Sequence, residues 1–129
     1  MSIPRMMRVN LQTLGCRLNE AELETWARQF QQLGHQITPD ETGADLVVVL
    51  AHSGLQTCSA NGDGENVARA LSEIPDIDAV FSGHVHEAYP AQPISAPKGQ
   101  AAPVVMPGFF GSHLAVIDLD LRFGESGWT

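Results

Sequence analysis

The sequence feature that most constrains the fold is the stretch Asp45-Leu-Val-Val-Val-Leu-Ala-His52. Its six consecutive apolar residues, three of them valine, lie between an acidic residue and a histidine that is followed by the turn signal Ser-Gly. Such a run is typical of a strand buried on both faces of a sheet, because a half-buried strand would alternate apolar and polar residues. The stretch therefore predicts a central parallel strand over residues 45–51.

The residues before this strand predict a strand, a helix and a second short strand. Residues 7–14 alternate apolar and polar side chains, which indicates a strand with one face more polar than is usual for a buried parallel strand. A helix over about 20–33 is predicted by apolar residues at helical spacing, a capping-box pattern that begins at Asn19, and Gly34 as a C-terminal stop. Residues 35–38 are a short strand candidate.

The residues after the central strand predict a parallel crossover. A polar loop leads to a helix cap within Asn61-Gly-Asp-Gly64, and a second helix from Glu65 carries an apolar stripe as far as Ile74. Residues 77–82 are typical of the next buried strand, which a right-handed crossover would place parallel to the central one.

The last part of the chain predicts a loop and two further strands. Residues 87–103 hold four prolines and predict an irregular, disordered loop. Residues 104–106 and 114–121 predict strands, and the short connection through Pro107-Gly-Phe-Phe-Gly111 favours antiparallel pairing between them.

Together these elements predict a single three-layer α/β domain over residues 1–129. We expect a flavodoxin-like, mostly parallel sheet in the order 2-1-3-4, with one or two antiparallel edge strands. A chain of 129 residues can form one real core but not two ordinary domains. Because two helices cannot cover both faces of such a sheet, we expect a homo-oligomer, with segment exchange through residues 87–103 as one form.

Charge and composition exclude some classes of function. The 15 acidic and seven basic residues give a net charge of −8, which argues against a nucleic-acid partner. No apolar run reaches the roughly 18 residues of a membrane span, and the amino end shows no secretory signal, so we expect no membrane partner and a cytoplasmic location. Cys16 and Cys58 could be free thiols, ligands or a disulfide, and the disulfide is the least expected without an export signal.

One group of motifs lies in the first half of the chain: Thr13-Leu-Gly-Cys-Arg-Leu-Asn-Glu20, the helix with Trp26, and Ala44-Asp-Leu-Val-Val-Val49. Over about residues 6–49 they resemble the amino-terminal domain of the radical SAM methylthiotransferases, which thiomethylate tRNA or a ribosomal protein. The resemblance implies that Cys16 helps to hold an auxiliary iron–sulfur cluster. His52 stands where the family has its second cysteine, and the chain contains no Cys-x-x-x-Cys-x-x-Cys motif, so methylthiotransferase activity is not expected.

A second group of motifs includes Val48-Val-Leu-Ala-His-Ser-Gly54, Ala79-Val-Phe-Ser-Gly-His-Val-His86 and the segment from Gly108 to Leu119. Over about residues 45–121 they resemble the calcineurin-like metallophosphoesterases, in the branch of the 5′-nucleotidases and 2′,3′-cyclic-nucleotide phosphodiesterases. The resemblance implies that His52, His84 and His86 are ligands of a two-metal site. The family's Asp-x-His, Gly-Asp-x-x-Asp and Gly-Asn-His-Glu motifs, which supply the bridging aspartate and the phosphate contacts, do not occur in the chain.

The candidate metal-ligating residues all follow predicted parallel strands. The carboxyl ends of such strands line one edge of a sheet, so we expect Cys16, His52, His84 and His86 to gather there. Imidazoles with a possible thiolate suit Zn²⁺ better than Mg²⁺ or Ca²⁺. The alternative is that these are solvated loop residues, with His84 and His86 on opposite sides of an extended segment.

These observations lead to a preferred hypothesis and two alternatives. The preferred one is a chimera, recombined or engineered near residues 44–50, that is folded, has no catalytic activity and is therefore not an enzyme, and binds metal weakly through its histidines. The first alternative is a residual metal-dependent phosphoesterase that acts on nucleotides. The second is an iron–sulfur module on Cys16 and Cys58, which two cysteines disfavour because clusters usually take four thiolates.

Overall fold

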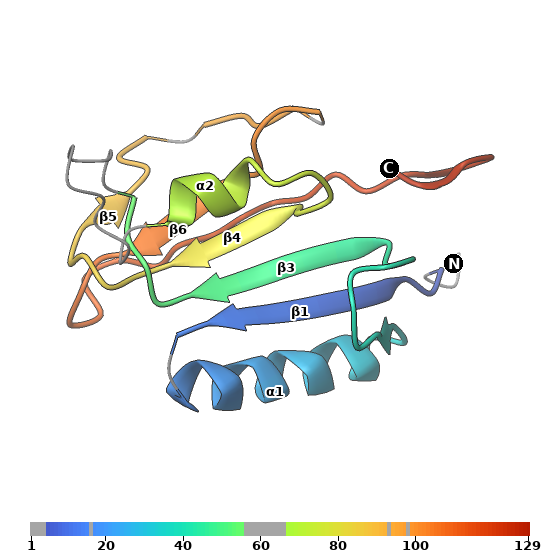
Figure 1. The fold of residues 1–129 in the computed structure, drawn as a ribbon, viewed down its shortest axis with the longest axis horizontal. Coiled ribbons are helices and arrows are strands. Elements are labelled where there is room, and N and C mark those ends of the chain that lie inside the picture. The colour runs from blue at the N-terminus through green and yellow to red at the C-terminus, as the bar shows by residue number, and fades with distance from the viewer. Residues whose placement is uncertain (1–4, 16, 56–66, 93, 98) are drawn as a thin grey trace.

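The fold is built on one long sheet with a helix on each face (Figure 1). The computed structural model describes residues 5–15, 17–55, 67–92, 94–97 and 99–129. Within them the elements are, in chain order, β1 (Arg8–Leu14), α1 (Arg17–Gln32), β2 (Gln36–Ile37), β3 (Leu46–Ala51), α2 (Ala68–Ser72), β4 (Ala79–Ser82), β5 (Ala88–Tyr89), β6 (Val104–Pro107), β7 (Phe123–Gly124) and β8 (Gly127–Trp128).

The main sheet has the strand order β2-β1-β3-β4-β6-β5. All neighbouring strands are parallel except β5, which pairs antiparallel with β6 at one edge. β3 lies between β1 and β4, with Leu14 beside Ala51 and Ala51 beside Ser82. The predicted three-layer, flavodoxin-like α/β fold is thereby confirmed, and the central strand predicted over 45–51 begins one residue later, at Leu46.

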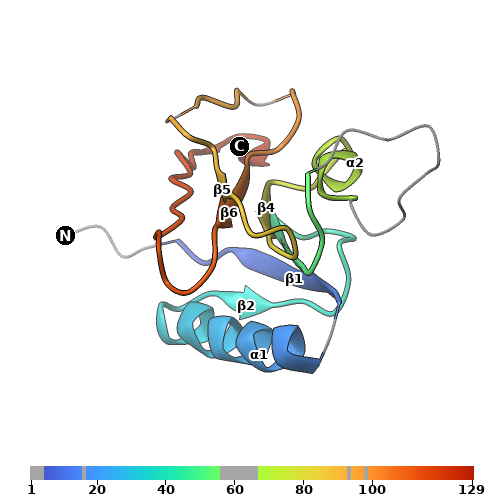
Figure 2. The same ribbon diagram turned by 90° about the vertical axis from the view of Figure 1, so that its left-hand side faces the viewer.

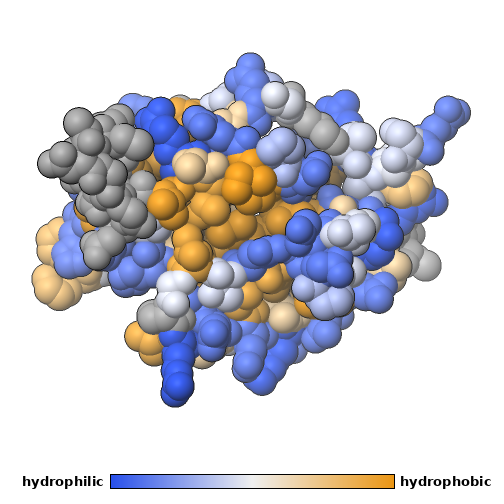
Figure 3. All heavy atoms as spheres, in the orientation of Figure 1, coloured by the Kyte–Doolittle hydropathy of each residue, from blue (hydrophilic) through white to orange (hydrophobic). Residues whose placement is uncertain are grey.

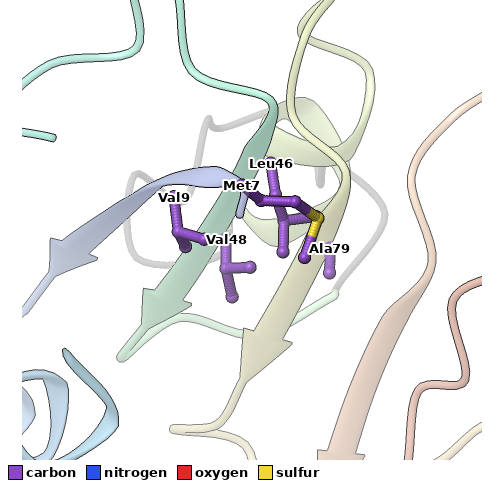
Figure 4. Packing of buried hydrophobic residues seen from close by; sticks show 5 residues of the cluster. All are labelled: Met7, Val9, Leu46, Val48 and Ala79. Carbon is purple, nitrogen blue, oxygen red and sulfur yellow. The ribbon is translucent and has the colours of Figure 1, made fainter. Parts of the chain in front are cut away.

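Alternate residues of β3 enter two separate cores, one on each face of the sheet. Leu46 and Val48 pack with Met7, Val9 and Ala79, and α1 covers this cluster through Trp26 and Phe30 (Figure 4). Val49 and Ala51 pack with residues of β4, β6 and α2 on the opposite face. Figure 2 shows the two helices on different sides of the strands. The six apolar residues of this strand are therefore explained by burial on both sides.

The polar face of β1 is covered by a loop. Asn10 is 2% exposed, and its Nδ2 donates to the carbonyl of Thr38 at 3.1 Å. Gln12 Nε2 donates to Asn10 Oδ1 at 2.8 Å and to a carboxylate oxygen of Glu41 at 3.2 Å. The loop after β2 thus satisfies polar groups that a covering helix would have left without partners.

Helix α1 begins earlier than its sequence predicts. It starts at Arg17, so Asn19 lies in the first turn, although the capping pattern predicted a start near residue 20. Because it lies inside the helix, Asn19 is not the cap; its side-chain nitrogen is buried and has no hydrogen-bond partner among the described residues. The predicted stop is confirmed, because Gly34 follows the last turn with φ +90°.

Helix α2 is shorter than predicted. It covers Ala68–Ser72, and its last turn tightens, since Glu73 N–H donates to the carbonyl of Ala70 at 3.2 Å. Val67 N–H, just before the helix, donates to Ser53 Oγ at 2.7 Å. The predicted cap at 61–64 lies outside the described residues.

The prediction of an antiparallel strand pair after residue 103 is wrong. β6 lies between β4 and β5, so its two hydrogen-bonding edges are already taken. β5 comes from the proline-rich segment for which a disordered loop was predicted. Residues 114–121 form no strand, although Ile117 and Leu121 still pack on the α1-side core. The two residues of β5, which come directly before Pro90, are thus enough to occupy the edge of the sheet beside β6.

Among the described residues, the short α2 is the only helix on its face of the sheet. Figure 3 shows apolar side chains gathered over β3, β4 and α2, with polar side chains around them. The expected homo-oligomer stays a prediction. No helix in the described part of the chain is long and apolar enough to cross a membrane.

A hydrogen-bonded ion pair joins the amino ends of β1 and β3. The backbone N–H of Arg8 donates to Asp45 Oδ2 at 2.8 Å, and Arg8 Nη2 donates to Oδ1 at 3.1 Å. The hydrogen bond from the Arg8 side chain holds the pKa of the Asp45 carboxyl below its usual range, against the smaller opposing effect of burial. The ionised carboxylate therefore favours the folded state.

We expect Val48→Asp to unfold the domain. Val48 is 5% exposed, and an unpaired buried charge costs several kcal/mol against a total stability of about 5–15 kcal/mol. Circular dichroism and chemical denaturation measure the loss. The matched control is Val116→Asp, because Val116 is 63% exposed and the same substitution should change stability there by less than about 0.5 kcal/mol. A folded Val48→Asp variant would contradict burial of this strand on both faces.

We expect Asp45→Asn to lower the free energy of unfolding in a pH-dependent way. The contribution of the carboxylate is complete above its unfolded-state pKa of about 3.9 and is lost as the pH falls through the lower folded-state pKa. Urea titrations should thus separate the two proteins at pH 7 and bring them together at an acidic pH below the folded-state pKa of the carboxyl. Asp120→Asn is the control, because Asp120 and its partner Arg122 are both 79% exposed and such pairs contribute little. Equal destabilisation at both pH values would exclude this role for the ionised carboxylate.

Candidate functional site

The candidate site lies where the parallel strands end. β1, β3 and β4 all finish at the left-hand side of Figure 1, and Gly15, His52 and Gly83 follow them. Ligand sites of open α/β sheets form at this edge because the loops there diverge from neighbouring strands.

His52 is held in place by the strand on either side. Its backbone N–H donates to the carbonyl of Leu14 at 2.7 Å. The next residue, Ser53, is 2% exposed, and its carbonyl accepts hydrogen bonds from the Ser82 hydroxyl and from Gly83 N–H, the latter at 3.2 Å. The histidine therefore begins a loop whose first two residues are fixed to the sheet.

Gly15 is the contact between the first strand and this histidine. It has φ +146°, and a Cβ atom added to it would lie 2.5 Å from His52 Cβ and 2.9 Å from Asn19 Nδ2. No side chain fits there, so the backbone after β1 can approach the imidazole closely only because residue 15 is glycine. The neighbouring Cys16 lies outside the described residues.

The structure brings His52 and His84 together. His52 Nε2 lies 3.1 Å from His84 Nδ1, at hydrogen-bond distance, and the ring centroids are 5.0 Å apart. In such a pair one nitrogen donates and the other accepts, and the tautomers of the two rings decide which does which. His84 has φ +73°, an uncommon conformation for a residue with a Cβ atom. This turn at the end of β4 directs its ring towards β3.

His86 has a different neighbour. Its ring stacks on Phe109, with centroids 5.1 Å apart and an interplanar angle of 23°. Within the part of the chain that the structure describes, no group of three histidine, cysteine, aspartate or glutamate side chains could hold a metal ion. The predicted four-residue metal site thus has two members in contact, one apart and one outside the described residues, and it stays a prediction.

Sequence reasoning missed two features of this edge. Asn19 was taken for a helix cap, whereas its buried, unpartnered Nδ2 lies close to Gly15. The four-residue spacing between Gly15 and Asn19 could have indicated this contact, because it places the Asn19 side-chain amide one helical turn after the glycine. The second feature is the exposure of Phe109 and Phe110, which the sequence placed only in the connection at 107–111; these residues are 46% and 97% exposed.

Comparison with known proteins gives a mixed resemblance. The family described as "Uncharacterized protein family UPF0004" matches residues 8–80, from β1 into β4. A ribosomal protein uS12 methylthiotransferase RimO from Salinispora tropica is 34% identical over 95 residues, which cover 58% of this chain and 19% of that protein.

Other relatives are named as nucleotide phosphoesterases. A 2′,3′-cyclic-nucleotide 2′-phosphodiesterase/3′-nucleotidase from Salmonella typhimurium is 41% identical over 96 residues, 68% of this chain and 15% of that protein. The trifunctional nucleotide phosphoesterase protein YfkN from Bacillus subtilis is 35% identical over 95 residues, 67% of this chain and 6% of that protein. The chain thus spans less than a fifth of the length of these relatives.

The prediction that the chain is not an enzyme is wrong. Relatives at 33–41% identity are named as phosphodiesterases, nucleotidases or phosphoesterases. The prediction depended on finding a complete set of ligands within 129 residues. Since the match covers so small a part of each relative, missing motifs in this stretch do not argue against catalysis.

We expect Gly15→Ala to destabilise the protein by more than about 1 kcal/mol, because alanine at positive φ is strained and the methyl group would overlap His52. Urea denaturation measures the change. Gly34→Ala is the control, because Gly34 has φ +90° but nothing within 4 Å of an added Cβ, so it reports the backbone strain alone. If Gly15→Ala cost no more than Gly34→Ala, the close approach to His52 would be disproved.

Proposed function

Since the chain belongs to the UPF0004 family over residues 8–80, we propose that this segment is the scaffold for a metal-dependent phosphoesterase that acts on nucleotides. His84, which pairs with His52, lies just beyond the matched residues. The names of the phosphodiesterase relatives support the reaction class. In this proposal, His52 and His84 are the metal-binding residues.

The observation that carries the proposal is the distance between the two imidazole nitrogens. Two nitrogen ligands of one tetrahedral Zn²⁺ ion, each at about 2.0–2.1 Å, are separated by about 3.3 Å. His52 Nε2 and His84 Nδ1 are 3.1 Å apart. Both residues are exposed, so an ion can reach them from solvent. A change of tautomer that carries the donor's proton on its other ring nitrogen, with a small rotation of each ring, would turn both lone pairs towards one ion.

The donor set fits only part of a catalytic metal centre. Two imidazoles are typical ligands for Zn²⁺ or Mn²⁺, and such an ion, when bound, would polarise a phosphate and lower the pKa of a bound water. A two-metal site also needs carboxylates to neutralise its charge. Cys16, which follows Gly15 in the sequence and lies outside the described residues, remains a candidate third ligand. We propose that the remaining ligands come from residues of this chain outside the described part.

We also infer that the chain joins two ancestral segments on one strand. The methylthiotransferase-like motifs end in β3, and the phosphoesterase-like motifs begin there. A parallel strand with buried faces can accept either continuation, because the crossover that follows it keeps the same twist and hand. The family match that continues to residue 80 supports a shared scaffold on both sides of this strand.

The proposed activity predicts metal-dependent release of phosphate from adenosine 3′-monophosphate. The 129-residue chain with Mn²⁺ or Zn²⁺ should turn over this substrate, and His52→Ala or His84→Ala should lower the rate at least tenfold because each removes half of the paired donors. His113→Ala is the control, because this exposed imidazole bonds only to its neighbour Ser112 among the contacts described. Isothermal titration with Zn²⁺ on the same variants reports binding separately.

Two results would overturn the proposal. One is turnover that is equal in the parent and in His84→Ala, which would point to a contaminating enzyme. The other is stoichiometric Zn²⁺ binding without any metal-dependent turnover, which would leave a metal site that is not a phosphoesterase.

A further inference from the structure

The loop that follows β6 presents two aromatic rings to solvent. Gly108, Phe110 and Gly111 have positive φ angles of +77°, +54° and +66°, and Ser112 N–H donates to the carbonyl of Phe109 at 3.2 Å. A Cβ atom on Gly108 would lie 2.8 Å from Ser112 Oγ, so the turn closes tightly on itself. The backbone of the loop is therefore well defined by local contacts, although its aromatic side chains lie outside the core.

Three rings form a continuous aromatic surface on this loop and the one after β4. His86 stacks on Phe109 at 5.1 Å, and Phe109 contacts Phe110 with centroids 5.0 Å apart and planes at 59°. We call these residues the aromatic platform. Phe110 is 97% exposed, and a phenylalanine with positive φ is strained by about 1–2 kcal/mol. Such outliers are typical of binding sites, because folding alone gains nothing from an exposed ring on a strained backbone.

The aromatic platform lies beside the imidazole pair. His86 is two residues after His84, so their Cα atoms are at most about 7 Å apart. Both belong to the segment that leaves β4, and Phe109 leaves its parallel neighbour β6 at the same edge of the sheet. Two of the described non-glycine residues with positive φ, His84 and Phe110, lie at this edge.

We propose that the aromatic platform binds the base of a nucleotide whose phosphate group meets His52 and His84. The inference rests on the proposed phosphoesterase function and adds the part of the substrate that the imidazole pair does not recognise. A purine or pyrimidine ring can stack on an exposed phenylalanine, and such stacking tolerates different bases because each has a π-face. Stacking requires no positive charge, which suits a chain of net charge −8.

The experiment separates base binding from phosphate chemistry. Adenosine, which has no phosphate, is titrated into the metal-free 129-residue protein and binding is followed by isothermal calorimetry and by ring-current shifts of the phenylalanine signals in NMR spectra. We expect Phe110→Ala and Phe109→Ala to weaken adenosine binding at least about fivefold, which is the lower end of the measured contribution of base stacking. Binding of ribose 5-phosphate to the Zn²⁺-loaded protein should stay unchanged in Phe110→Ala.

Phe123→Ala is the matched control. Phe123 is 49% exposed, close to the 46% of Phe109, but it contacts Trp128 in the carboxyl-terminal hairpin. Equal adenosine binding in the parent, Phe109→Ala and Phe110→Ala would overturn the proposal, as would the absence of binding to the parent at millimolar adenosine. Phe110 would then be a contact for another protein. Because the adenosine titration uses neither metal nor turnover, its failure is distinguishable from failure of the phosphoesterase proposal.

Discussion

The structure depends on the burial of β3 on both of its faces. Leu46 and Val48 belong to the core under α1, whereas Val49 and Ala51 belong to the core under α2. A strand without a solvent face needs a neighbour on each edge and a layer on each side, so it dictates a three-layer sheet. β1 and β4 occupy the two edges, and their register follows from the backbone hydrogen bonds to this strand.

The site inherits its geometry from the same strand. His52 follows β3 directly and bonds to Leu14 of β1, while the next residue, Ser53, bonds to Gly83, which follows β4. Gly15 permits the close approach on one side, and the left-handed conformation of His84 closes the other. Because the backbone positions are fixed by the sheet, the metal site that we propose requires only small rotations of the two imidazole rings.

The fold explains how one chain can resemble two families. The family-matched region supplies β1, α1 and the strands up to β4, while the paired His84 and the aromatic platform lie after it. The residues with chemistry thus sit in loops, and the residues that determine the fold sit in strands. Loops can change without altering the core that positions them.

The sequence by itself determined the central strand, the order of its parallel neighbours and the end of α1, because these follow from local apolar patterns and from one glycine. Tertiary structure alone decided that β5, and not residues 114–121, pairs with β6, since an edge accepts only one partner and several segments compete for it. It also decided which imidazoles meet. The sequence placed His52, His84 and His86 at one edge of the sheet. In the structure, the backbone turn at His84 brings its ring to that of His52, whereas the ring of His86 stacks on Phe109. Side-chain direction after a strand depends on loop torsion angles, which spacing does not encode.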